Sequence, residues 1–166
     1  MDDICWGKKG NTESKKLVSG EKKEPTFDYI EITGNRIYFY SGIEMDRILH
    51  LNKSIRNMST ELRRAVVNLN REPVPIHLHI NSYGGGIFAG LASMNEIIDS
   101  TVPVYTFVDG CCASAGTFLS LCGKKRFINR HAYMLIHQLS SVMWGKYEEF
   151  KDVIKNLDKL MIMIRQ

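Results

Sequence analysis

The feature that most constrains the fold of this chain is a regular alternation of strand-like and helix-like segments. Residues 76–80 (IHLHI) alternate apolar and polar side chains, as a half-buried strand does, and residues 87–99 follow with helical spacing. A strand-like segment over 102–108 and an apolar helical segment over 114–122 repeat the order. Such alternation predicts an α/β fold with a mostly parallel sheet. Three shorter strands are also expected, at 36–41, 127–128 and 133–136.

Two further helices are predicted from periodic apolar residues. The first spans 44–69, with apolar residues three or four positions apart, and should end before Pro73, because proline lacks an amide donor. The second is expected to start at Gly145 and continue to the end of the sequence. In the helix predicted over 87–99, the apolar residues that share one face are Ile87, Leu91, Met94 and Ile98.

The size and composition are those of one globular domain. The chain has 166 residues, of which 44% are hydrophobic and 24% charged, which excludes a collagen-like or disordered protein. It has no run of about 18 apolar residues, so we expect no membrane span, and no secretory signal is evident. Residues 1–26 contain three Lys-Lys pairs and scattered apolar residues, and they predict a flexible polar tail before a folded domain over 27–166.

The charge and the cysteine pattern limit which ligands and which cellular compartment we expect. The formal net charge of +4 is weakly basic and not gathered with aromatic residues, so no nucleic-acid partner is expected. Two histidines on the same face of one predicted strand, His77 and His79, lack an evident third ligand, and we expect neither a metal nor a cofactor. No CxxC spacing occurs, which argues against zinc and favours a reducing, cytoplasmic location. The four cysteines are Cys5, Cys111, Cys112 and Cys122.

Two glycine-rich turns at strand ends are the candidate functional sites. Residues 81–86 (NSYGGG) could turn backbone amides toward an anion, or form only a tight strand–helix turn; they match neither a Walker A loop nor a dinucleotide fingerprint. Residues 109–116 place Ser114 at the expected start of a helix. Ser114 could be a nucleophile beside free backbone amides, or simply the N-cap of that helix.

A histidine that could serve as a general base follows a predicted strand. His137 ends the segment 133–136 and precedes a polar turn, where its imidazole could accept a proton from a nearby serine. The alternative is an ordinary packed or solvated histidine. His131, in a polar turn, is the weaker candidate.

Four separated segments, in this order, resemble the proteolytic subunits of the Clp protease family. They are RIYFYSG (36–42), INSYGGGIFAG (80–90), GCCASAGTFL (110–119) and YMLIHQ (133–138). The resemblance covers about residues 34–166. It implies a ClpP/crotonase-like α/β fold of repeated ββα units with a protruding handle helix. It also implies a serine endopeptidase that hydrolyses unfolded polypeptides inside a homo-oligomer of stacked rings fed by an AAA+ unfoldase.

The resemblance also implies roles for individual residues. Ser114 would be the nucleophile and His137 the general base of the peptidase. The backbone amides of Gly85 and Ala115 would form the oxyanion hole, and Gly84 and Gly86 would lie beside a bound peptide.

Some positions depart from the family pattern. Tyr83 replaces a proline, Ala115 replaces a methionine, and residues 139–141 replace a proline-containing turn. The third catalytic residue of the family, an aspartate, lies beyond the handle helix, inside which this sequence ends at Gln166. We therefore expect either a C-terminally truncated peptidase domain or an acid supplied from elsewhere. The in-chain candidates for that acid are Asp109, Asp152 and Asp158.

Two alternative functions remain open at the level of sequence. The first is a catalytically inactive ring subunit, which the missing acid favours and the Ser114–His137 pair opposes. The second is an acyl-CoA hydratase or isomerase of the related crotonase type, which also uses two backbone amides as an oxyanion hole. That class depends on carboxylates near the site, whereas the candidate groups here are a serine and a histidine.

Overall fold

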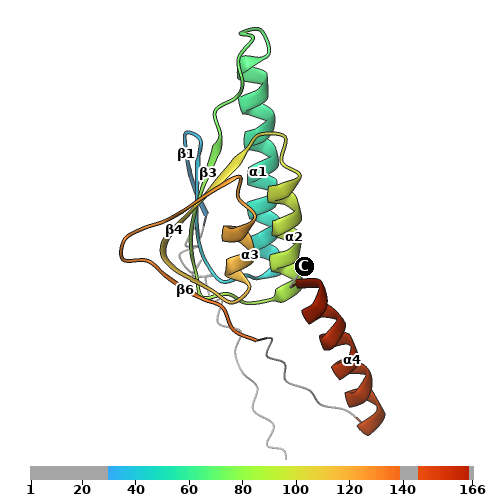
Figure 1. Cartoon of the computed structure of the whole chain (residues 1–166). Coiled ribbons are helices and arrows are strands. Elements are labelled where there is room, and N and C mark those ends of the chain that lie inside the picture. Colours follow the sequence, from blue (N-terminus) through green and yellow to red (C-terminus); the bar gives the residue numbers. More distant parts are fainter. Residues whose placement is uncertain (1–29, 139–145, 165–166) are drawn as a thin grey trace, which may run out of the picture.

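A sheet with helices packed on one face forms the body of the molecule in this computed structural model, which describes residues 30–138 and 146–164 (Figure 1). The strands lie in the order β1-β2-β3-β4-β5, and β6 also pairs with β4. The strands are β1 (Ile30–Thr33), β2 (Arg36–Tyr40), β3 (Ile76–Ser82), β4 (Val104–Ala113), β5 (Lys125–Ile128) and β6 (Tyr133–Leu135). The helices are α1 (Met45–Val66), α2 (Ile87–Ile98), α3 (Gly116–Leu121) and α4 (Tyr147–Ile164).

The predicted parallel sheet is confirmed. Strands β2, β3, β4 and β5 pair in parallel with their neighbours, and β6 pairs in parallel with the last part of β4. Strand β1 was not predicted and pairs antiparallel with β2. Because the carboxyl ends of parallel strands meet at one edge, the turns after β3 and β4 are brought side by side.

The core lies between the sheet and its covering helices. The inward side chains of β2 and β3, Ile37, Phe39, Leu78 and Ile80, are fully buried. Helix α1 covers them with the apolar face expected from its spacing, since its buried apolar residues are Ile48, Leu51, Ile55 and Met58. The long helix is therefore confirmed in type and in buried face.

Helix α2 is confirmed in its bounds, but its large apolar face does not point into the core. Its buried residues are small with one exception: Ala89, Gly90, Ser93 and Ile97. Small residues allow close approach to α3, because a Cβ added at Gly90 would lie 2.9 Å from the Phe118 ring. Ile87, Met94 and Ile98 instead line a cavity, where Phe88 joins them.

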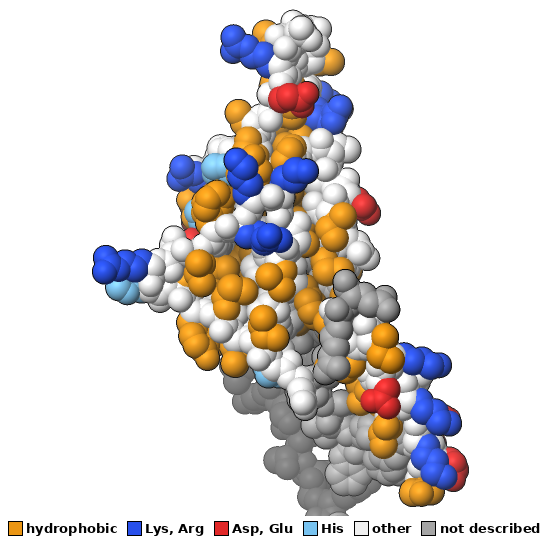
Figure 2. Space-filling view, viewed as in Figure 1, with side chains coloured by type: hydrophobic (Ala, Val, Ile, Leu, Met, Phe, Trp, Pro, Cys, Tyr) orange, Lys and Arg blue, Asp and Glu red, His pale blue; other side chains and the backbone are white. Residues whose placement is uncertain are grey.

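Helix α4 protrudes from the body, and its C-terminal end lies beside α2 (Figure 1). The lysine side chains of α4 lie along the edge turned away from the body, and many apolar side chains lie on the side of the body that this view shows (Figure 2). Among the described helices, none combines the length and apolar character needed to cross a membrane. The predicted tail over 1–26 and the turn over 139–141 lie outside the described residues.

Candidate active site

Ser114 lies in a sharp turn between β4 and α3 and is not the cap of the helix. Its φ of 52° is in the left-handed region, which is uncommon for a residue with a side chain. The N-cap of α3 is Ala115, and no side-chain hydrogen bond caps the helix. The Ser114 amide donates to the carbonyl of Leu135 in β6, 2.8 Å away, and thereby fastens the turn to the sheet. Strained backbone of this kind gathers at functional sites, so the nucleophile interpretation gains over the N-cap interpretation.

The glycine-rich turn after β3 lies directly against Ser114. Gly84 and Gly85 have φ values of 93° and 149°, and a Cβ added at Gly84 would lie 2.7 Å from the Cβ of Ser114. The backbone of Ile43 holds this turn from the other side: its amide donates to the Gly84 carbonyl, and its carbonyl accepts from the Gly86 amide. The two candidate turns therefore meet, as the sheet topology requires.

Two backbone amides at this junction are left without an acceptor. Within the described residues, the N–H groups of Gly85 and Ala115 donate to no backbone or side-chain oxygen. Both residues line the same cavity as Ser114. Free backbone N–H groups beside a serine hydroxyl are the kind of donors that an oxyanion hole requires.

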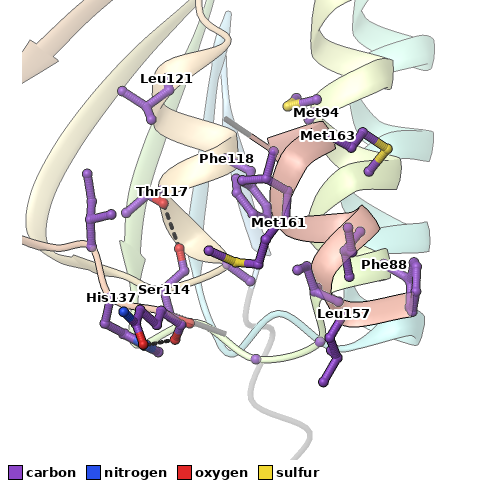
Figure 3. A pocket seen from close by; sticks show the side chains of 18 of the residues that line it. Phe88, Met94, Ser114, Thr117, Phe118, Leu121, His137, Leu157, Met161 and Met163 are labelled. Atoms are coloured by element: carbon purple, nitrogen blue, oxygen red, sulfur yellow. Dashed lines mark hydrogen bonds between the residues drawn. The ribbon is translucent and has the colours of Figure 1, made fainter. Parts of the chain in front are cut away.

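His137 follows β6 and lies at the same end of the cavity as Ser114 (Figure 3). The Nδ1 atom of its ring is within hydrogen-bond distance of the Gln138 carbonyl oxygen. A carbonyl oxygen only accepts, so Nδ1 carries the proton and Nε2 is the basic nitrogen. In the described part of the chain, no hydrogen bond joins His137 to the Ser114 hydroxyl, although catalytic hydrogen bonds often tighten only when substrate is bound.

The cavity that begins at these residues has a volume of about 1500 Å³ and runs between α2, α3 and α4. Its lining contains Gly85, Gly86, Ser114, Ala115 and His137 but not Gly84, which packs against Ala113 and Ser114. The remainder of its wall is mainly apolar (Figure 3). Large side chains in that wall are Phe88, Met94, Phe118, Leu157, Met161 and Met163.

The candidate acids lie away from His137. Asp109 extends from the uncovered face of the sheet, where its carboxylate binds Nδ1 of His79 at 2.9 Å and accepts the Tyr40 hydroxyl at 2.7 Å. Desolvation, together with the hydrogen bond to Asp109 and its charge, raises the pKa of Tyr40 to about 12, so this hydroxyl stays protonated. Asp152 and Asp158, on α4, are not among the residues that line the cavity. Among the described carboxylates, none is bonded to His137.

We expect an Asp109→Ala variant to lose stability but not the reactivity of Ser114. The change removes the acceptor for three side chains, of which His79 is largely buried, whereas Tyr40 and Asn129 are exposed and can bond to water instead. A loss of about 1–3 kcal/mol in the free energy of unfolding should follow, measurable by urea titration. If the variant also lost labelling by a serine-directed probe at matched folded concentration, Asp109 would have a catalytic role.

The other polar candidates have structural surroundings. His77 stacks on Tyr105, and burial, with the charges of Arg36 and His79, lowers its pKa. Among the described residues, no cluster of three or more ligands could hold a metal ion. Burial raises the pKa of the Cys122 thiol to about 12, so this cavity-lining cysteine acts as a neutral apolar group. His131 is not among the described residues that line the cavity, and Cys5 lies outside the described residues.

The family to which the chain belongs follows from its similarity to known proteins. The family model described as Clp protease matches residues 33–166. The chain belongs to the Clp protease family. The sequence resemblance over about 34–166 and the α/β fold class are thereby confirmed.

Curated relatives of this Clp family chain come from several bacteria. It is 31% identical over 131 residues to the ATP-dependent Clp protease proteolytic subunit 2 of Treponema pallidum. The aligned residues make up 76% of this chain and 66% of the relative. Identity to the proteolytic subunit 1 of Chlamydia abortus is 46% over 129 residues, covering 75% and 62%. For the proteolytic subunit 1 of Protochlamydia amoebophila it is 39% over 89 residues, covering 51% and 43%. The chain thus spans less than two thirds of the length of these relatives.

Proposed function

We propose that this chain is the peptidase domain of a Clp-type serine endopeptidase, with Ser114 as nucleophile and His137 as general base. The observation that carries the proposal is that Ser114, His137 and two backbone N–H groups without an acceptor line one cavity. Ser114 Oγ would attack the peptide carbonyl while Nε2 of His137 takes its proton, and the Gly85 and Ala115 amides would bind the oxyanion. The C–N bond then breaks, the leaving amine receives the proton from His137, and water hydrolyses the acyl-enzyme.

The Gln138 carbonyl supports this assignment of roles. By accepting from Nδ1–H, it selects the tautomer whose Nε2 is free to take a proton. A carbonyl dipole stabilises the imidazolium formed during attack less than a carboxylate does. A carboxylate from outside the described residues would therefore raise the rate.

The cavity and the exposed strands support an extended, apolar polypeptide as substrate. Gly84 and Gly86 flank the free amide of Gly85, where an extended chain could add as a strand, and the wall beyond is apolar. A folded domain has no free strand of this kind, so the substrate would be an unfolded polypeptide. That requirement supports an AAA+ unfoldase as partner.

Exposed apolar side chains support a homo-oligomer built as stacked rings. Beside the site, Tyr133 and Ile136 are 59% and 73% exposed, and β5 adds Phe127 and Ile128. Apolar surface of this extent on an open sheet edge favours burial against another subunit. We place the assembly in the cytoplasm, to which the free thiols of Cys111, Cys112 and Cys122 are suited.

Labelling with a fluorophosphonate probe tests the proposal directly. The assembled protein should give a mass adduct on the peptide that contains Ser114, and a peptide aldehyde should compete with labelling. Heat-denatured protein is the control, because labelling should depend on the folded site. An assembled protein without the Ser114 adduct would instead support the inactive ring subunit. The crotonase-type alternative is disfavoured, because no carboxylate is found among the described residues that line the cavity.

A further inference from the structure

We propose that Asn81 and Ser82 are positioning residues that set the distance between the nucleophile and the oxyanion hole. This inference rests on the proposed peptidase function. The two residues are neighbours at the end of β3, between the two turns that form the site. Neither lines the cavity, so neither touches substrate there. Each uses its side chain to accept a backbone N–H from a different turn.

Ser82 holds the glycine-rich turn. Its hydroxyl oxygen accepts the amide of Gly84 at 3.2 Å, and the residue is almost fully buried. A Cβ added at Gly116, the first residue of α3, would lie 3.3 Å from the Cβ of Ser82. Ser82 therefore packs against the start of α3, the helix that follows Ser114. On its other side, its hydroxyl holds the Gly84 amide, one residue before the Gly85 amide. No acceptor other than this hydroxyl is found for the Gly84 amide among the described residues.

Asn81 holds the segment that leads to Ser114. The register between β3 and β4 shifts here, since Ile80 is opposite Val108 but Ser82 is opposite Cys112. The extra residues of β4 lose their regular ladder partners at this bulge. The Asn81 Oδ1 atom replaces them by accepting the Cys111 amide at 2.8 Å. A Cβ added at Gly110 would lie 2.9 Å from the same oxygen, so the amide side chain fits closely into the bulge.

Through these contacts, the end of β3 holds the two turns of the site in place relative to each other. The Gly85 amide belongs to the turn that Ser82 holds, and Ser114 follows the bulge that Asn81 holds. Loss of either side chain should let one turn shift relative to the other. An oxyanion donor works only within hydrogen-bond distance of the developing charge, so a small shift lowers the rate of attack more than it weakens substrate binding.

The test compares Ser82→Ala with Ser54→Ala in the assembled protein. Ser54 is a matched control, because it is also buried but bonds within α1 to the His50 carbonyl, away from the site. For Ser82→Ala we expect kcat on a fluorogenic peptide to fall by roughly ten-fold to a hundred-fold with little change in KM. The Ki of a peptide aldehyde, whose adduct places an oxyanion in the hole, should rise in parallel. Ser54→Ala should match the wild type in kcat, KM and Ki.

Asn81 offers an independent pair of variants. Asn81→Asp keeps the acceptor oxygen and should retain most of kcat, whereas Asn81→Leu should lower it as Ser82→Ala does. Both residues are proposed to set the same distance, that between the Ser114 hydroxyl and the oxyanion hole. The fall in kcat of the double variant should therefore be smaller than the product of the two single falls. If Ser82→Ala does not fold, Ser82→Cys, whose sulfur is a weak acceptor of similar size, should show the same loss of kcat.

The outcomes separate the two proposals. A wild type labelled at Ser114, with Ser82→Ala equal to Ser54→Ala in kcat and Ki, would overturn the positioning role alone. A rise in KM with unchanged kcat would also overturn it, because that result indicates lost substrate binding. A wild type without labelling or hydrolysis would overturn the proposed function and this inference with it.

Discussion

A Ser114→Ala variant is expected to lose peptide hydrolysis almost completely, with kcat lower by roughly four to six orders of magnitude. The hydroxyl is the only group we assign to attack the peptide carbonyl, and its turn is held in place by the bond from the Ser114 amide to Leu135. That bond uses the backbone, so alanine preserves it. Initial rates with a fluorogenic peptide, measured on assembled protein with confirmed thermal stability, give the result.

The companion variants make this expectation specific. His137→Ala should lower kcat by a similar factor, and the double variant should lose little more, because nucleophile and base act as one unit. Ser93→Ala is the matched control: Ser93 is buried in α2, and its hydroxyl has no partner among the described residues. It should keep the wild-type rate. Hydrolysis retained by Ser114→Ala would assign the nucleophile to another residue.

The strand and helix order could be predicted because each long segment carries a clear period. The strict alternation of 76–80 and the long apolar spacing of α1 are local signals, and tertiary structure preserves them. Strand β1 was missed for the opposite reason. It has only four residues, of which three are exposed, and its structure depends on antiparallel pairing with β2.

The buried face of α2 could not be predicted from apolar spacing. Ile87, Met94 and Ile98 satisfy the helical period, but they line the cavity, and small residues face the core instead. Periodicity shows which side chains share a face, not whether that face meets a core or a ligand. An apolar helix face next to a glycine-rich turn is therefore an ambiguous signal, which the structure resolves in favour of the cavity.

Residue type points to the candidate site in the sequence, but it does not give the geometry of that site. Small residues around Ser114 indicated a tight turn, yet a serine there suits an N-cap as well as a nucleophile. The structure adds the positive φ of Ser114 and the bond from its amide to Leu135 in β6, and residue type indicates neither of them. The contributions of Ile43 and of the Gln138 carbonyl come from the backbone, so no residue type signalled them.

Replacing Gly85 by alanine should lower kcat by roughly a hundred-fold to a thousand-fold, which is less than the loss expected from replacing Ser114 or His137. A Cβ at this position would lie 2.5 Å from the carbonyl oxygen of Ile43, and the φ of 149° is one that side-chain-bearing residues rarely adopt. The backbone of Ile43 cannot give way easily, because it is bonded to both Gly84 and Gly86. The peptide of Gly85 must therefore rotate, which turns its N–H away from the oxyanion.

Gly86→Ala is the steric comparison for this variant. A Cβ there would meet its nearest atom, the Ile43 carbonyl oxygen, at 3.5 Å, which is ordinary contact, and its φ of −67° suits any residue. The loss of kcat should therefore be much smaller at Gly86 than one residue earlier. Fluorophosphonate labelling adds a second readout, because phosphonylation of Ser114 also develops negative charge on an oxygen in the hole. Equal labelling rates for Gly85→Ala and wild type would mean that the Gly85 amide is not an oxyanion donor, and that the Ala115 amide acts without it.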